Sequence, residues 1–353
     1  MKGIGMDEFA LIRRLNRPRS DRGAAPAASG VKMGIGDDAA VLRPSSGREL
    51  VVSCDTMVET VHFKPETMRS DDIGYKAMAA ALSDLAAMGA EPRWALVALT
   101  VPPQSWTADE LRELYDGLYA CADRYGVAVV GGDTTSSPAG LTVTVTVIGE
   151  AADGRSLLRS AAEPGDAVFV TGPLGGSAAG LHALLARGER AGPIERLPEP
   201  LQPLVRAHRR PEPRFDAARL LAAAEPGVCG ALNDVSDGLA SEAREIAEAS
   251  GVRIALDGAS IPLADELSEY AASVGADPLE WALYGGEDFE LVGTVRRDRA
   301  EELAAAFERA GRRIWFVGQV SAAAAEDGAA VTIVREPGGA EVPLAKNGYN
   351  HFA

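Results

Sequence analysis

Strand-like and helix-like segments alternate along most of this chain, and this alternation limits its fold more than any other feature. Arg93 to Val101 and Val127 to Val130 have the apolar character of strands. Thr107 to Tyr125, between them, has a helical pattern that opens with a capping-box pair, and Leu239 to Ser250 shows another helical pattern in the second half. The sequence therefore predicts an α/β (α+β) protein in which helices cover sheets.

The length of 353 residues exceeds what one hydrophobic core usually organises. We expect two domains, residues 1–150 and 151–353, joined by a linker within Gly149 to Gly165. In the second domain, a Pro- and Arg-containing stretch from residue 187 to Arg214 is interpreted as a connection between helical and strand segments.

The composition excludes several classes of protein. A formal net charge of −16 repels nucleic acid, and no apolar segment reaches the length of a membrane span. Cys54, Cys121 and Cys229 form no C-x-x-C pair, which indicates neither a disulfide framework nor a zinc site and is typical of the reducing cytoplasm. An acidic protein that handles phosphates needs cations, so divalent metals are expected.

Acidic residues stand beside glycine or serine at the ends of several apolar strands. Each such segment alone is an ordinary turn, but together they predict a site built at strand ends. The segments are Gly36-Asp37-Asp38, Ser53-Cys54-Asp55, Gly131-Gly132-Asp133, Asp234-Val235-Ser236-Asp237 and Gly285-Gly286-Glu287-Asp288.

Asp84 is a further acid, and it lies within a predicted helix from Ser70 to Met88. At about 100° per residue it falls in the stripe of small apolar residues that includes Ile73 and Ala77. A helix cap or a salt bridge to a neighbouring helix is one explanation. A metal partner is the other, because an unpaired buried carboxylate is costly.

Aspartate oxygens are ligands that Mg²⁺ prefers, so several acids indicate several magnesium ions. The chain has no G-x-x-x-x-G-K-[ST] loop, and Gly34-Ile35-Gly36 lacks the preceding strand of a dinucleotide site. Gly172-Pro173-Leu174-Gly175-Gly176 opens a predicted helix, where it can cradle an anion or serve only as a close-packing turn.

Taken in order, these segments resemble the thiamine-monophosphate kinase family, part of the aminoimidazole-ribotide-synthetase-like superfamily. The resemblance covers nearly the whole chain. It is carried by Gly34-Ile35-Gly36-Asp37-Asp38-Ala39, by residues 82–90 (LSDLAAMGA), by Gly131-Gly132-Asp133-Thr134-Thr135, by Asp234-Val235-Ser236-Asp237-Gly238-Leu239, by residues 284–291 (YGGEDFEL) and by Gly348-Tyr349-Asn350-His351-Phe352.

The resemblance implies a two-domain fold whose N-terminal sheet domain forms a homodimer, and a kinase that uses ATP and several Mg²⁺ ions to convert thiamine monophosphate to thiamine diphosphate. It implies a magnesium shell of Asp37 or Asp38, Ser53, Cys54, Asp55, Asp84, Asp133, Asp234 and Asp237. Gly132, Asp133, Arg159 and Ser236 resemble the ATP contacts, and His62, Glu287 and Tyr349 resemble the contacts to the thiamine phosphate.

Three residues depart from the family pattern: Cys54 stands where threonine is usual, Thr60 where glycine is common, and Asn350 where aspartate is usual. A thiol is a poor magnesium ligand, so the backbone carbonyl or water would have to replace the usual contact at Cys54. His62, taken alone, is better explained as a packed or surface histidine.

The acceptor phosphate is largely ionised at neutral pH, so the main obstacle to transfer is charge repulsion. The mechanistic hypothesis is that Asp55, Asp84, Asp133 and Asp234 hold the magnesium that bridges both phosphates for direct in-line transfer. The alternatives are another ATP-using enzyme of the superfamily, such as a ribotide or selenophosphate synthetase, and a noncatalytic sensor of metal and nucleotide.

Overall fold

The structure is a computed structural model that describes residues 8–15, 30–35, 39–323, 330–335 and 337–345. The chain divides into two compact units. Unit 1 comprises residues 1–85, 90–154 and 188–192, and unit 2 comprises residues 86–89, 155–187 and 193–353. These units depart from the predicted division at residue 150 by the short segments 86–89, 151–154 and 188–192.

Unit 1 is built on a four-stranded sheet with the order β3-β6-β4-β5. Its strands are β3 (Arg48–Val58), β4 (Glu91–Val101), β5 (Ala128–Ser136) and β6 (Thr142–Ala152). β6 pairs antiparallel with β3 and β4, whereas β4 and β5 are parallel. Alternating valines on β6, such as Val143 and Val145, are fully buried, as expected for a strand with one covered face.

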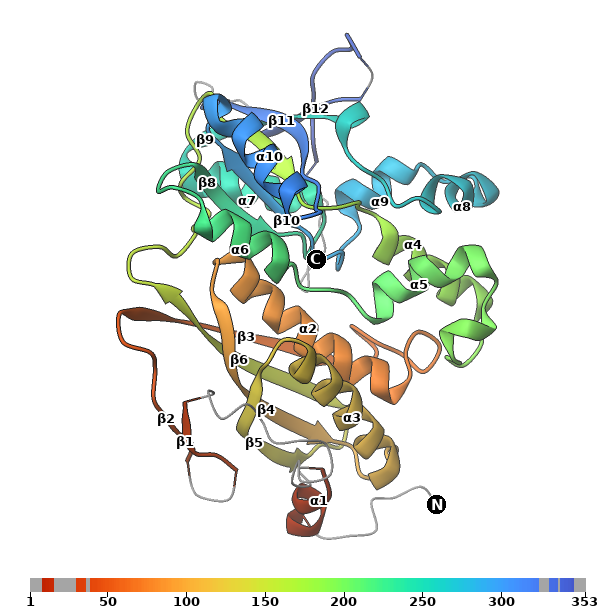
Figure 1. Cartoon of the computed structure of the whole chain (residues 1–353). Coiled ribbons are helices and arrows are strands. Elements are labelled where there is room, and N and C mark those ends of the chain that lie inside the picture. The colour runs from red at the N-terminus through yellow and green to blue at the C-terminus, as the bar shows by residue number, and fades with distance from the viewer. Residues whose placement is uncertain (1–7, 16–29, 36–38, 324–329, 336, 346–353) are drawn as a thin grey trace. The chain divides into compact units, whose positions relative to one another are not determined.

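Two helices, α2 (Ser70–Ala87) and α3 (Ala108–Arg124), lie across one face of this sheet (Figure 1). The predicted capping box forms at the start of α3, where Thr107 and Glu110 satisfy each other's backbone amides. The two helices cross at glycines: a Cβ atom on Gly74 would lie 1.8 Å from the Leu114 carbonyl oxygen, and one on Gly117 would lie 1.8 Å from that of Asp71. The short helix α1 (Glu8–Leu15) packs against α3.

Part of the opposite face of the sheet is covered by a small antiparallel pair, β1 (Val31–Met33) and β2 (Val41–Leu42). Leu42 packs there against Trp94, Ala128 and Val130. This packing lies at the β4–β5 side of the sheet, so it leaves the outer surface of the edge strand β3 exposed.

Unit 2 contains a second, largely antiparallel sheet with the order β13-β12-β9-β11-β7-β10-β8. β12 and β9 form its parallel pair among the described strands. The strands are β7 (Ala167–Val170), β8 (Cys229–Asp234), β9 (Val252–Asp257), β10 (Leu291–Val295), β11 (Trp315–Ala322), β12 (Val331–Val334) and β13 (Val342–Pro343).

The helices of unit 2 are α4 (Gly176–Arg187), α5 (Gln202–Arg209), α6 (Phe215–Ala223), α7 (Leu239–Ser250), α8 (Leu267–Val274), α9 (Pro278–Tyr284) and α10 (Ala300–Arg309). α7 begins and ends where the sequence predicted, and its apolar residues pack with those of the sheet in one core cluster. The stretch interpreted as a connection up to Arg214 instead contains α5, which packs against α4.

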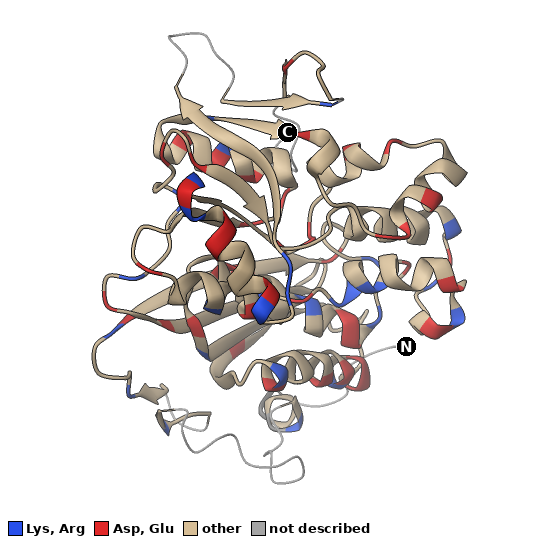
Figure 2. Ribbon diagram, turned by 45° about the horizontal axis from the view of Figure 1, so that its top comes forward, with Lys and Arg blue, Asp and Glu red and all other residues tan. Residues whose placement is uncertain are grey.

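The two-domain α/β fold class is thus confirmed. Lys and Arg (blue) and Asp and Glu (red) are interspersed along the helices, as Figure 2 shows. In the described part of the chain, no helix combines the length and the apolar character needed to cross a bilayer.

Candidate active site

Ser53 and Asp84 meet in unit 1, where the hydroxyl of Ser53 on β3 donates a hydrogen bond to the Asp84 carboxylate on α2. Ser53 and Asp55 pair in register with the buried residues Val147 and Val145 of β6, so both side chains lie on the face of the sheet that the helices cover. Asp84, predicted from its place in an apolar stripe, is partly buried and hydrogen-bonded.

Cys54 lies between Ser53 and Asp55 on β3, and strand alternation turns its side chain to the opposite face of the sheet. Its thiol is exposed and accepts a hydrogen bond from the Thr146 hydroxyl, at 3.3 Å between Sγ and Oγ1. The structure therefore does not bring this thiol together with Ser53 and Asp84. Only the backbone of Cys54 could take part with them.

Gly132 and Asp133 follow a register shift in the pairing of β5 with β4. Gly132 has a φ of +156°, and a Cβ atom there would lie 1.9 Å from the Val97 carbonyl oxygen, so only glycine fits. Asp133 is exposed and accepts a hydrogen bond from the Thr134 amide at 2.9 Å.

Asp37, Asp38 and Tyr349 lie outside the described residues. Among the residues that are described, no three His, Cys, Asp or Glu side chains lie close enough to hold a metal ion. The complete predicted magnesium shell therefore stays a prediction.

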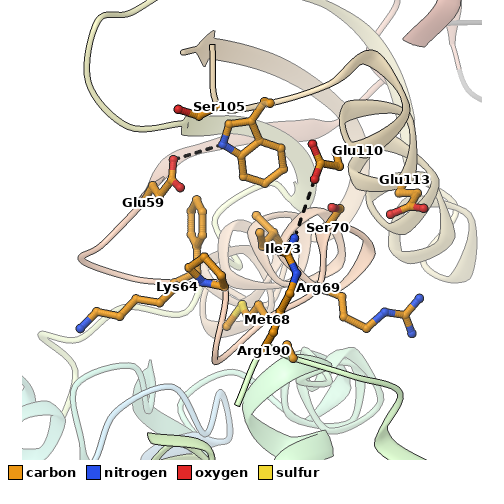
Figure 3. Close-up of a pocket in the computed structure, with 14 residues that line it drawn as sticks. Glu59, Lys64, Met68, Arg69, Ser70, Ile73, Ser105, Glu110, Glu113 and Arg190 are labelled. Atoms are coloured by element: carbon orange, nitrogen blue, oxygen red, sulfur yellow. Dashed lines mark hydrogen bonds and ion pairs between the residues drawn. The ribbon is translucent and has the colours of Figure 1, made fainter. Parts of the chain in front are cut away.

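His62 lies on the loop that follows β3, where its Nδ1 accepts a hydrogen bond from the Val58 amide at 2.9 Å. The same loop forms one wall of a pocket of about 440 Å³ (Figure 3). Trp106 lines the pocket and donates through Nε1 to Glu59 at 3.2 Å, and Arg190 approaches Glu110 to 3.8 Å.

This pocket is separate from Asp84. Ser70, at the start of α2, lines it, whereas Asp84 lies fourteen residues further along the same helix. At 1.5 Å of rise per residue, that spacing corresponds to about 20 Å. The pocket also carries charges of both signs, including Glu59 and Lys64, so its lining selects no one class of ligand.

In unit 2, β8 ends at Asp234, which is buried, and the loop that follows carries Ser236 and Asp237. Glu242, in the first turn of α7, is also buried. Burial raises its pKa to about 8, and the negative charges of Asp234 and Glu245 add to the effect. The carboxyl groups of Asp234, Glu242 and Glu245 therefore lie close enough to repel one another when they are ionised.

Glu242 was not among the site residues predicted from the sequence. The sequence pattern that singled out Asp84 is also present at Glu242. This residue interrupts the apolar stripe of Leu239, Ala243 and Ile246 on a predicted helix. Arg159 lies within the same unit, where its Nε donates to the Asn233 side-chain oxygen at 2.9 Å.

Glu287 lies on a strained loop between α9 and β10. It has a φ of +70°, and its amide donates to the Ser236 carbonyl at 2.7 Å, which ties this loop to the one after β8. A Cβ atom on Gly286 would lie 2.5 Å from the same carbonyl oxygen. Glu287 Oε2 lies 3.5 Å from Nδ1 of the buried His208.

The contacts of Asp288 show whether the glycine-rich segment before α4 cradles an anion from outside the protein or is a close-packing turn. Its carboxylate accepts hydrogen bonds from the amides of Gly175 at 2.7 Å and Ser177 at 3.0 Å. A Cβ atom on Gly172 would lie 2.2 Å from the Glu290 carboxylate. Protein carboxylates therefore occupy this helix start, and the segment is a close-packing turn.

Comparison with known proteins places both domains in one group. The N-terminal domain model of the AIR synthase related proteins matches residues 36–151, and the C-terminal domain model of the same group matches residues 163–329. The thiamine-monophosphate kinase of Bacillus subtilis (strain 168) is 42% identical over 98% of this chain and 100% of its own length.

Solved structures agree with this assignment. The thiamine-monophosphate kinase of Stenotrophomonas maltophilia K279a is 36% identical, with a TM-score of 0.78 over 94% of this chain and 98% of that one. A structure described as AaThiL complexed with AMPPCP and TMP is 29% identical, with a TM-score of 0.73 over 98% of this chain and 97% of that one.

Proposed function

The chain belongs to the thiamine-monophosphate kinase family, and from this premise we propose that it transfers a phosphoryl group from ATP to thiamine monophosphate, giving thiamine diphosphate and ADP. Similarity over the full length of both domains is the observation that carries this function. A relative that holds an ATP analogue together with TMP supports both substrates.

The donor set in the two units fits a hard divalent cation. Unit 1 presents the oxygens of Ser53, Asp55 and Asp84 on one side of its sheet, and unit 2 gathers the carboxyl groups of Asp234, Asp237 and Glu245 around Glu242. The proposed magnesium ligands are Asp37 or Asp38, Ser53, Asp55, Asp84, Asp133, Asp234 and Asp237, with the backbone of Cys54 in place of its thiol. When bound, Mg²⁺ neutralises phosphate charge and aligns the two phosphates for direct in-line transfer.

The remaining proposed contacts divide between the two substrates. Gly132, Asp133, Arg159 and Ser236 are assigned to ATP. Gly132 suits this role because a residue without a side chain lets a phosphate approach the backbone closely. His62, Glu287 and Tyr349 are assigned to thiamine monophosphate, and the charge of Glu287 complements the cationic thiazolium ring.

We also propose that the protein is a homodimer joined through the sheet of unit 1, in the cytoplasm, where ATP is supplied. The support comes from the outer surface of the edge strand β3, where Leu50 is 50% exposed and Val52 is 60% exposed. Large apolar side chains on an uncovered strand favour a protein partner. A second copy of the chain offers the same surface and so a self-complementary contact.

Replacement of Asp84 tests the proposed function. Asp84→Asn keeps the volume and an oxygen that can accept the Ser53 hydroxyl, but it removes the charge. We expect turnover of thiamine monophosphate with ATP and Mg²⁺ to fall by more than about 100-fold, the size expected when metal-based charge stabilisation is lost. Formation of thiamine diphosphate and ADP is measured, and circular dichroism confirms the fold.

Asp116→Asn is the matched control, because Asp116 is an aspartate on the other helix of unit 1 and pairs with Arg112 at the surface. This control should keep full activity. Near-normal turnover in Asp84→Asn would contradict the proposed role of Asp84. Wild-type protein that consumes no ATP with thiamine monophosphate would contradict the function and would favour a sensor or another enzyme of the superfamily.

A further inference from the structure

A buried carboxylate lies beneath the loop that carries the proposed ligands of unit 2. Glu242 is 2% exposed, and its two oxygens accept hydrogen bonds from this loop and from the end of β8 that precedes it. Oε1 accepts from the Ser236 hydroxyl at 3.2 Å and from the Asp237 amide at 2.9 Å. Oε2 accepts a short hydrogen bond from the side-chain nitrogen of Asn233. Glu242 therefore holds residues on both sides of Asp234.

Asn233, which is 1% exposed, extends this arrangement to Arg159. Its side-chain oxygen accepts from Arg159 Nε at 2.9 Å, while its nitrogen donates to Glu242 and approaches Glu245 Oε2 at 3.3 Å. If the Asn233 amide were flipped, its oxygen would face the Glu242 and Glu245 carboxylates and its nitrogen would face the Arg159 N–H donor. The partners thus fix a single orientation of Asn233.

The same loop is fixed from its other side by backbone contacts. The Ser236 carbonyl accepts the Glu287 amide, and Gly238 has a φ of +97°, with its Cβ position 2.6 Å from the Leu283 carbonyl oxygen. The backbone is therefore held on one side and the side chains on the other. Glu242 and Asn233 therefore set the directions of the Ser236 and Asp237 groups, and Asn233 sets that of Arg159 together with Glu245, whose Oε2 lies 2.9 Å from Arg159 Nη1.

We propose that Glu242 and Asn233 are positioning residues that pre-arrange Arg159, Ser236 and Asp237 for the nucleotide and its metal. The inference rests on the proposed function, because that function assigns the three residues to ATP and Mg²⁺. Neither Glu242 nor Asn233 has to touch a substrate. Their effect comes from holding a guanidinium, a hydroxyl and a carboxylate at fixed distances before the nucleotide binds.

A reciprocal exchange of donor and acceptor tests this arrangement. Glu242→Gln sets an amide donor against the Asn233 donor, and Asn233→Asp sets a carboxylate against the Glu242 carboxylate. In the double variant the amide introduced at position 242 donates to the carboxylate introduced at position 233. That carboxylate still accepts from Arg159 and keeps the total charge unchanged, but it also faces the Glu245 carboxylate, which accepts from the Asn233 amide at 3.3 Å in the wild type.

We expect each single variant to lower kcat/KM for ATP by at least about 10-fold, as the loss of one buried hydrogen bond would. The KM for thiamine monophosphate should stay within about 2-fold of its wild-type value, a separation that general damage to the fold would not give. The double variant should recover part of the loss and keep a kcat/KM well above the product of the two single effects, with repulsion between the carboxylate introduced at position 233 and Glu245 as the remaining deficit. Glu248→Gln, on the exposed side of the same helix, is the matched control and should behave as wild type.

Binding of AMPPCP with Mg²⁺, measured by calorimetry, separates this inference from the proposed function. If wild type binds the analogue and fails to phosphorylate thiamine monophosphate, the acceptor is wrong, while the positioning role is still judged from analogue binding by the variants. Single variants that bind the analogue as wild type does would overturn the positioning role. A double variant as impaired as the product of the two single effects would overturn it as well.

Discussion

The buried ion pair between Glu290 and Arg214 gives the sharpest prediction about stability. Glu290 is 2% exposed, and its carboxylate accepts hydrogen bonds from the Arg214 guanidinium and, at 2.8 Å, from the Thr171 hydroxyl. Burial raises the pKa of Glu290, and the Arg214 charge opposes that rise. Arg214→Met would remove the guanidinium and leave the buried Glu290 carboxylate with only the Thr171 hydroxyl of these two hydrogen-bond donors.

The size of the effect follows from these exposures. Breaking a buried ion pair by removing one partner costs about 3–5 kcal/mol. The Arg214 side chain is 28% exposed, so water can reach the vacated position and the lower end, about 3 kcal/mol, applies. In a domain of 150–250 residues, this corresponds to a fall in Tm of roughly 6–12 °C.

Urea and thermal unfolding measure this loss of unfolding free energy. Four proteins are compared: wild type, Arg214→Met, Glu290→Gln and the double variant. The double variant should regain at least half of the lost free energy of unfolding, because a neutral amide replaces the unpaired charge. The deficit of Arg214→Met should shrink as the pH falls, because protonation of Glu290 neutralises the same charge. Arg297→Met, at an exposed position, is the control.

The reasoning is refuted if Arg214→Met unfolds within about 0.5 kcal/mol of wild type, the range typical of surface substitutions. It is refuted equally if the deficit is the same at pH 8 and pH 5. In either case Glu290 would not be an uncompensated buried charge after the substitution.

Two further predictions concern the dimer and the response to pH. Val52→Glu should convert a dimer to monomers, measured by light scattering, whereas Val274→Glu, a matched change on α8, should not; a monomeric wild type would contradict the dimer. Burial raises the pKa of Asp288 to about 7. The folded state therefore binds more protons than the unfolded state between about pH 4 and 7, and this group lowers the free energy of unfolding as the pH rises through that window. The stability of Asp288→Asn relative to wild type should therefore improve between pH 5 and pH 8 in urea unfolding, and a constant difference would show that Asp288 does not titrate there.

The sequence predicted those features that local patterns encode. α7 has the predicted bounds because Gly238 and Gly251 flank a helical apolar stripe, and α3 starts at its capping box. Asp84 was identified because a carboxylate interrupts an apolar face, and that carboxylate proved to be hydrogen-bonded to Ser53. The same rule would have identified Glu242.

Features that depend on residues remote in sequence were beyond such patterns. α5 was missed because its polar composition and flanking prolines are also those of a loop, and packing against α4 stabilises it as a helix. The anion at the start of α4 is Asp288, more than 100 residues away, and no local signal pairs the two segments.

By itself, then, the sequence determined elements such as α3 and α7, the two-domain class and the family, because periodicity, caps and ordered motifs are local or linear properties of the chain. Tertiary structure decided which face of β3 each of Ser53, Cys54 and Asp55 occupies, and which partners satisfy Glu242 and Glu290. The physical reason is that a buried polar group is stable only where the fold brings a partner to it, and the fold chooses that partner from anywhere along the chain.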